Sequence, residues 1–361
     1  MVVELGSVAV AAPEAASNVT HATAAAALGD KANLTLIPSS LSLESGNSTN
    51  GRGWHVGIVG AVTRYLCGAV VLAFVLAAPA AAAPPPVTQL RVGSQPYRLA
   101  VSGGSLWASV NGTATILRIE PRSGRITARY RVGGGPGSLA LAGGKVWIGN
   151  YTGSSIIRLN PAKHAVRRIR VGDQPIAVDA SAGAVWAADK RDGRVTKVSV
   201  RTGKVLLHRT FRLESHEGLV VQPDGVWTSS ETGVVHKLDP RTGKTLLTVT
   251  VGEDSDYITA GSGSIWVSCY DDENLWRLDP TTGKVLQTIP IGPGAQGMAV
   301  DGTTVWVANF DTGQLLRVDT AAGRVTDTIR VGPQPRGVAI AGGYVWVANS
   351  AGSTLTRVPL R

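Results

Sequence analysis

The sequence has little cysteine, few charged residues and few aromatic residues for its 361 positions. Its two cysteines, Cys67 and Cys269, are too few for a disulfide framework or a four-thiolate zinc site. Charged residues contribute 17% and aromatic residues 5%, but apolar residues reach 43%, which excludes a wholly disordered chain. The 44 glycines and 19 prolines argue against a helix-rich fold, because both residues interrupt helices.

Motifs of several enzyme classes are also missing. The chain has no G-x-S-x-G nucleophile motif, no glycine-rich phosphate loop before a helix and no Cys/His metal spacing. An uninterrupted apolar run covers only residues 65–78, which is shorter than the roughly 20 residues of a membrane span.

The N-terminal part of the sequence differs from the rest. Residues 1–54 are rich in Ala, Ser, Thr and Asn without a sustained period, which predicts a disordered extension or a stretch outside the natural product. Residues 55–83 combine Arg64, an apolar run and an alanine-rich exit, which are typical of a secretory signal peptide. Because signal peptides do not usually begin this late, we expect translation to start at Val56 or Val62.

A unit of about 40 residues recurs seven times after this leader. Each unit carries an aliphatic-Trp pair in the second of four short β-type runs that are separated by turn residues. The pairs are Leu106-Trp107, Val146-Trp147, Val185-Trp186, Val226-Trp227, Ile265-Trp266, Val305-Trp306 and Val345-Trp346. Seven four-stranded repeats predict a β-propeller over residues 87–361.

The two ends of the repeat region complement each other. The last unit stops after its third run, residues 354–358, and the missing fourth run appears at the other end as residues 87–91. We therefore predict an all-β, seven-bladed propeller of four-stranded blades whose last blade is closed by the N-terminal strand. This closure pairs two edges that would otherwise be bare.

Residues that recur in every unit are most simply parts of the framework. The seven tryptophans are predicted to fill the wedges between blades. His164 aligns with turn glycines such as Gly283, so we interpret it as a turn residue and not as a ligand. Trp276 breaks the repeat and is a candidate for a surface contact, while Cys269 is predicted to be a small buried hydrophobe.

The net charge of +10 also follows the repeat. Arg or Lys recurs once per unit in the third run, and in four units an acidic residue follows two positions later, which predicts a solvated, partly paired rim. Charge spread in this way does not form a nucleic-acid-binding groove, so we predict no nucleic-acid partner. A loose, salt-sensitive attraction to anionic polymers of the cell envelope fits it better.

The repeat resembles a known type. V-W-V-A-N at 305–309 and 345–349, P-R-G-V-A at 335–339 and D-P-T-T-G-K at 279–284 resemble the YVTN-type β-propeller repeat, and more broadly the streptogramin (virginiamycin B) lyase-like propellers. This resemblance implies a ligand face formed by the connections that enter the first strand and leave the second strand of each blade. It implies no particular activity, because the repeat serves many functions.

Units four and five depart from the repeat on that implied ligand face. Their connections gather acidic side chains with a histidine and two tyrosines, a set that suits Ca²⁺, Mg²⁺ or a cationic ligand, although exposed loops are also often acidic for solubility alone. The candidate metal ligands are Glu217, Asp254, Asp256, Asp271, Asp272 and Glu273. The candidate catalytic residues are His216, Glu217 and Tyr257. The candidate ligand-binding residues are Glu231, Tyr270, Asn309 and Asp311.

The resemblance to streptogramin lyases implies two histidines and a carboxylate-held Mg²⁺, but only His216 falls on the implied face. His164, His208 and His236 lie elsewhere in the repeat, so general base and general acid roles are not both filled. We therefore expect a binding or scaffold module without catalysis of its own, carrying a protein or small-molecule ligand on the loop face. The alternative is a metal-dependent lyase or lactonase, streptogramin-lyase-like or gluconolactonase-like, centred on units four and five.

The predicted signal peptide, residues 55–83, indicates where in the cell the protein is expected. We expect the propeller to be exported, either secreted or associated with the cell envelope. If residues 65–83 are retained, they would anchor it to the membrane.

Overall fold

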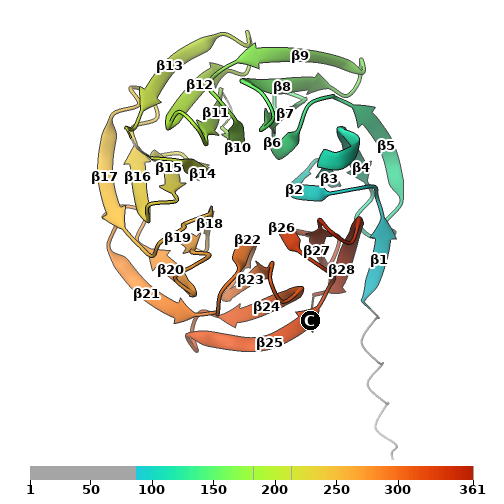
Figure 1. Cartoon of the computed structure of the whole chain (residues 1–361), viewed down its shortest axis with the longest axis vertical. Coiled ribbons are helices and arrows are strands. Elements are labelled where there is room, and N and C mark those ends of the chain that lie inside the picture. The colour runs from blue at the N-terminus through green and yellow to red at the C-terminus, as the bar shows by residue number, and fades with distance from the viewer. Residues whose placement is uncertain (1–86, 182, 213, 361) are drawn as a thin grey trace, which may run out of the picture. The chain divides into compact units, whose positions relative to one another are not determined.

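Seven antiparallel sheets of four strands stand around a common axis in the computed structural model (Figure 1). The structure describes residues 87–181, 183–212 and 214–360. The expectations for the N-terminal extension, the leader and Cys67 fall outside these ranges. Within them, the prediction of an all-β propeller with seven four-stranded blades is confirmed.

Each blade runs from an inner strand near the axis to an outer strand at the rim (Figure 1). The inner strands are β2 (Pro96–Ser102), β6 (Pro136–Ala142), β10 (Pro175–Ala180), β14 (His216–Gln222), β18 (Tyr257–Gly261), β22 (Ala295–Asp301) and β26 (Pro335–Ala341). The second strands are β3 (Ser105–Val110), β7 (Lys145–Asn150), β11 (Ala184–Asp189), β15 (Gly225–Ser230), β19 (Ser264–Ser268), β23 (Thr304–Asn309) and β27 (Tyr344–Asn349).

The third and outer strands complete the blades. The third strands are β4 (Thr115–Ile119), β8 (Ser155–Asn160), β12 (Arg194–Ser199), β16 (Val234–Leu238), β20 (Asn274–Leu278), β24 (Gln314–Asp319) and β28 (Thr354–Pro359). The outer strands are β5 (Ile126–Arg131), β9 (Ala165–Arg170), β13 (Val205–Thr210), β17 (Thr245–Thr250), β21 (Val285–Pro290), β25 (Arg324–Arg330) and β1 (Thr88–Arg91). One 3-10 turn, η1 (Asn111–Thr113), follows β3.

The N-terminal strand closes the last blade, as predicted. Strand β1 pairs antiparallel with β28, with Thr88 opposite Arg357. The Arg357 Nε donates a hydrogen bond to Thr88 Oγ1 at 2.6 Å. The two ends of the repeat region therefore meet in one sheet, where β1 pairs with the edge of β28 that would otherwise be bare.

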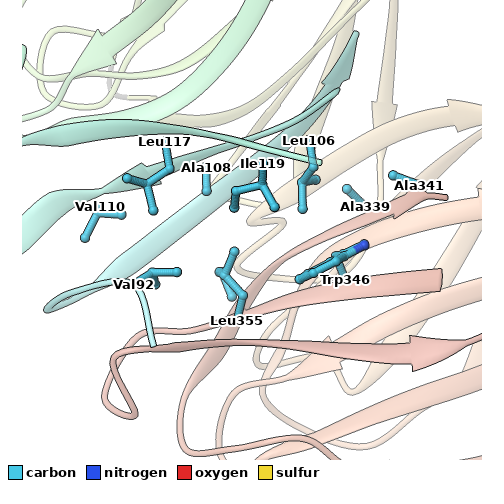
Figure 2. Packing of buried hydrophobic residues seen from close by; sticks show 11 residues of the cluster. Val92, Leu106, Ala108, Val110, Leu117, Ile119, Ala339, Ala341, Trp346 and Leu355 are labelled. Atoms are coloured by element: carbon cyan, nitrogen blue, oxygen red, sulfur yellow. The ribbon is translucent and has the colours of Figure 1, made fainter. Parts of the chain in front are cut away.

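Hydrophobic clusters fill the wedges between neighbouring blades. Figure 2 shows the cluster at the closure, where Leu106 and Leu117 of the first blade face Trp346 and Leu355 of the last blade. Val92, which follows β1, joins the same cluster. The junction is thus held by packing as well as by strand pairing.

The repeated tryptophans belong to this framework, as predicted, because all seven are buried. In six blades the basic residue of the third strand lies over the indole ring, 5.3–5.8 Å from its centroid. These residues are Arg118, Arg158, Lys197, Lys237, Arg277 and Arg317. The repeating basic residues therefore cover tryptophan faces, a contact worth about 0.5–1 kcal/mol at exposed sites.

This arrangement corrects the predicted rim of charge pairs. Within the described ranges, none of the seven ion pairs joins a third-strand basic residue to the acidic residue two positions later. Those carboxylates instead accept backbone N–H groups of the following turn; Asp239, for example, accepts from Arg241 and Thr242. The prediction assumed that the basic residue and the acidic residue two positions later pair because they lie on the same face of the strand. The backbone N–H groups of the turn are closer donors for the carboxylate.

Two smaller predictions also hold. His164 has a positive φ of 51°, as expected of a turn residue aligned with glycines. Cys269 is fully buried, and burial raises the pKa of its thiol to about 12. In the described part of the chain, no helix is long and apolar enough to cross a membrane.

Candidate functional site

The connections that lead into the inner strands and those that follow the second strands meet on one face of the propeller, which we call the loop face. In six blades the first residue after the second strand donates its N–H to the carbonyl of the residue before the inner strand, and in the fifth blade Tyr270 donates to Asp254 in a similar way; the seven distances are 2.7–3.1 Å. These pairs are Asn111 with Gln95, Tyr151 with Gly135, Lys190 with Gln174, Glu231 with Ser215, Tyr270 with Asp254, Phe310 with Gly294, and Ser350 with Gln334. The connections that enter the inner strands and those that leave the second strands therefore lie on the same face, as the family resemblance implied.

In four blades the residue whose carbonyl accepts this hydrogen bond is not glycine but still has the positive φ of the left-handed backbone region. Gln95, Gln174, Gln334 and Asp254 have φ of 55°, 56°, 53° and 51°. Such backbone costs of the order of 1 kcal/mol or more per residue, and it persists where the surroundings fix it. Here the inter-loop hydrogen bonds fix it, and three of the four side chains are glutamines directly before the proline of an inner strand.

The glutamines line a cavity of about 470 Å³ at the axial end of the loop face. Its walls come from five blades and carry mostly uncharged polar and aromatic groups. The lining residues are Gln95, Tyr97, Asn111, Tyr151, Gln174, Ile176, Lys190, Glu217, Gln334, Arg336, Ser350 and Ala351. A cavity of this size with a few converging polar groups is the usual form of a ligand site.

One position at the start of each inner strand, or directly before it in the fifth blade, gives this opening its varied side chains. It lies three residues before the residue that pairs with the blade's tryptophan. We call this set the mouth ring, and its members are Tyr97, Gly137, Ile176, Glu217, Asp256, Gln296 and Arg336. Unlike the tryptophans, these residues differ from blade to blade, so the symmetric framework presents an asymmetric set of side chains.

Two neighbouring members of the mouth ring, Glu217 and Asp256, form its acidic half, and Lys190 pairs with the first of them. Lys190 forms ion pairs with Glu217 and, at 2.7 Å, with Glu231. Burial opposes the charge on Lys190, but these hydrogen bonds outweigh it and raise the lysine pKa. Burial, together with the neighbouring carboxyl of Asp256, raises the pKa of Glu217, and Asp256 itself accepts a hydrogen bond from Gln296.

Two other neighbouring members, Arg336 and Tyr97, form the cationic and aromatic half of the mouth ring. The Arg336 guanidinium donates to Gln296 Oε1 at 3.4 Å and lies 5.3 Å from the Tyr97 ring centroid. The guanidinium also lies over the Phe310 ring, 4.4 Å from its centroid. Glu217, Asp256, Gln296, Arg336 and Tyr97 thus form a continuous chain of contacts around the opening.

Arg98 lies directly behind this cationic half. Its guanidinium lies between the rings of Tyr97 and Tyr257, 4.8 Å from each centroid, and it donates to the Arg336 carbonyl at 3.3 Å. Tyr257, a predicted catalytic residue, therefore flanks a cation, and burial raises the pKa of its hydroxyl.

The structure corrects the expectation that His216 faces a ligand. His216 is the first residue of β14 and is fully buried, with its Nδ1 3.2 Å from Thr228 Oγ1. His236 lies in the third strand β16, as expected, but its ring packs near that of His216, with 6.2 Å between the centroids. The Nε2 atoms of His216 and His236 lie 3.6 and 2.8 Å from Glu214 Oε2, below the loop face.

The candidate metal and ligand residues lie on the loop face but have separate partners. Tyr270 donates to Asp311 at 2.7 Å, and Asp272 accepts from Asn274 and Trp276. Asp254 is half-buried, and burial raises its pKa to about 6. The remaining two acidic candidates, Asp271 and Glu273, are exposed.

Asn309 is buried and ties its own loop, donating to the Pro293 carbonyl at 2.7 Å. Within the described ranges, no group of three or more His, Cys, Asp or Glu side chains is arranged to hold a metal ion.

Comparison with known proteins places the chain in a family. The family model described as outer membrane protein assembly factor BamB matches residues 53–288 and 191–357, which together span most of the chain. The chain belongs to this family. No curated protein sequence matches it.

Solved structures of low sequence identity share the fold. BamB from Moraxella catarrhalis is 14% identical, with a TM-score of 0.59 over 76% of this chain and 99% of that one. A chain described as Kuenenia stuttgartiensis hydrazine synthase is also 14% identical, with a TM-score of 0.66 over 75% and 97%. The computationally designed Ika8 protein is 13% identical, with a TM-score of 0.59 over 74% and 96%. At such identity the likeness extends to the propeller alone.

The sequence reasoning missed the cationic half of the opening. Arg98, Arg336 and the nearby Lys190 were neither candidate site residues nor among the repeating basic residues of the third strands. A signal was present in the residue after Pro96, Pro136, Pro175 and Pro335, because this position changes from Tyr to Gly, Ile and Arg between units. Comparing the repeats for every departure, and not only for acidic ones, finds it.

Proposed function

We propose that this protein is a protein-binding scaffold of the cell envelope, which uses its loop face to hold a partner. The observation that supports this most is the match to the BamB family model across the propeller. The family is described as an outer membrane protein assembly factor, which supports a role in the cell envelope and in contact with other proteins. The solved BamB of Moraxella catarrhalis has the same fold over nearly its whole length.

The form of the loop face fits such a role. A rigid ring of sheets fixes the ends of the connections, and the cavity at the axis is built from side chains that differ between blades. Binding sites on connections positioned by a rigid scaffold are common, because the framework tolerates variation there. A partner would thus be recognised by the mouth ring and by the loops around it.

Export and the domain layout belong to this proposal. Residues 55–83 would direct the chain out of the cytoplasm, residues 87–361 would form the working domain, and retention of residues 65–83 would tie it to the membrane. Among propellers, the repeat would be of the YVTN type, with binding in place of catalysis.

Affinity purification from separated cell fractions tests the proposal. The protein carries a C-terminal tag, and the envelope, soluble and culture fractions are purified in parallel in mild detergent. We expect a defined envelope protein to co-purify in constant proportion from the envelope fraction. Recovery of the protein from the cytoplasm alone, or without any partner at constant proportion, would contradict it.

A further inference from the structure

Two arginines at the axial opening have no acidic partner in the described part of the chain. The ion pairs found there involve other residues, and neither Arg98 nor Arg336 takes part in one. Arg98 is only 6% exposed. Burying a charge is costly unless the charge is paired and hydrogen-bonded, so an unpaired buried guanidinium marks a place where an anion would be favoured.

The carboxylates of the mouth ring, Asp256 and Glu217, help to raise the pKa of Arg98 through space, but neither forms an ion pair with Arg98 or Arg336. Glu217 is engaged by Lys190, and Asp256 accepts from the side-chain amide of Gln296. Glu231, the next acidic group, also pairs with Lys190. The three carboxylates therefore share one lysine and one side-chain amide, and none of them forms an ion pair with Arg98 or Arg336.

The donors of the two arginines are also largely unused. A guanidinium has five N–H donors, and each of these side chains makes one hydrogen bond, at 3.3 Å for Arg98 and 3.4 Å for Arg336. Both guanidinium carbons lie near the same Tyr97 ring, at 4.8 and 5.3 Å from its centroid. Stacking on tyrosine fixes the planar groups and leaves their edges available for a carboxylate, which a guanidinium can bind through two parallel hydrogen bonds.

The surroundings favour a peptide as the carrier of that carboxylate. Gln95, Gln334 and Asn111 line the same cavity as Arg336, and their side-chain amides both donate and accept hydrogen bonds. A peptide backbone alternates N–H and C=O groups and can use both. Phosphate oxygens only accept, so they would leave the amide oxygens unpartnered.

We propose that the axial cavity binds an extended peptide segment of the partner and receives one of its carboxylates at Arg98 and Arg336. The carboxylate belongs either to an Asp or Glu side chain or to a free C-terminus. This inference rests on the proposed scaffold function and specifies the chemistry of its partner.

Calorimetric titration of the purified protein with short probe peptides tests it. The probes are alanine-based hexapeptides with an acetylated N-terminus, and they carry a free C-terminus, an amidated C-terminus, or an amidated C-terminus with two glutamates. We expect one or both carboxylate peptides to bind at least about tenfold more tightly than the neutral amidated peptide. The first and third probes distinguish a terminal from a side-chain carboxylate.

Variants locate the interaction. Arg336→Gln should weaken the carboxylate peptide about tenfold or more, and Arg336→Lys should restore only part of the loss, because an ammonium lacks the planar fork. Arg330→Gln, on the exposed rim at the end of β25, removes the same charge and should change nothing. Equal binding of the neutral peptide, tighter binding of inorganic phosphate, or an unaffected Arg336→Gln protein would overturn the inference.

The scaffold proposal and this inference fail separately. If the envelope partner co-purifies but neither carboxylate peptide binds, the scaffold stands and the carboxylate site is wrong. If no partner co-purifies from the envelope, the scaffold proposal fails whatever the peptides do.

Discussion

Asp189 is a buried carboxyl group whose replacement should stabilise the protein. It ends β11 at the position where β7, β23 and β27 end in asparagine, and it is fully buried. In those blades the asparagine bonds its loop, as when Asn150 Oδ1 accepts the Gly135 N–H at 2.8 Å. Neither oxygen of Asp189 has a hydrogen-bond partner in the described ranges. Burial, reinforced by the nearby Asp192 charge, raises the Asp189 pKa from 3.8 to about 8.

The shifted pKa sets the size of the effect. At pH 7 the unfolded chain gains by ionising this carboxyl, while the folded chain keeps it protonated, so the group costs about 4 kcal/mol of folding free energy. Below pH 3.8 the Asp189 carboxyl is protonated in both states and does not lower the free energy of unfolding. As the pH rises from 3.8 to 8, ionisation in the unfolded chain alone lowers that free energy progressively. Asp189→Asn removes this term, so the variant should be more stable by up to about 4 kcal/mol at pH 7 and by less than about 1 kcal/mol at pH 4.

Urea unfolding of both proteins at pH 4, 7 and 9, followed by tryptophan fluorescence, measures the difference. Asp301→Asn, at the exposed end of β22, is the control for loss of one negative charge and should match the parent protein at each pH. A variant that is no more stable at pH 7 than at pH 4, or that is destabilised throughout, would show that Asp189 is ionised or partnered in the folded state.

Three further outcomes follow from the framework. Burial lowers the pKa of His216 from 6.5 to about 4, so this residue should cost up to about 3 kcal/mol of stability as the pH falls from 6.5 to 4, and His216→Asn should remove that dependence in urea unfolding. Trp147→Ala should lower the free energy of unfolding by about 3–5 kcal/mol, whereas Trp276→Ala, at a half-buried side chain, should cost clearly less in the same assay. A chain beginning at residue 92 lacks β1 and exposes the edge of β28, so it should aggregate in light scattering, while one beginning at residue 87 should stay monodisperse.

The repeat made the framework predictable. Seven aliphatic-Trp pairs at nearly constant spacing set the blade count, and the truncated last unit indicated that residues 87–91 close the ring. Both inferences use local patterns that repeat, so an accidental feature of one unit cannot mislead them. The positive φ of His164 was predictable for the same reason, because the aligned residues are glycines.

The candidate site was less predictable because it depends on contacts between blades. His236 lies on a third strand and His216 at the start of an inner strand, and only the packing around Phe211 brings their rings together. The pairing of Lys190 with Glu217 likewise joins two neighbouring blades. Side-chain alternation along one strand does not contain this information, which explains why the acidic residues were noticed and their basic partner was not.

Site-specific photo-cross-linking in cells tests the claim that the loop face holds a partner most directly. A photoreactive residue replaces Gln174 or Gln334 beside the axial cavity, or Thr303 in the turn at the opposite end of the sixth blade. We expect the two loop-face positions to cross-link to the same envelope protein and Thr303 to give no such product. Cross-links from Thr303 alone, or equal products from both faces, would contradict the account.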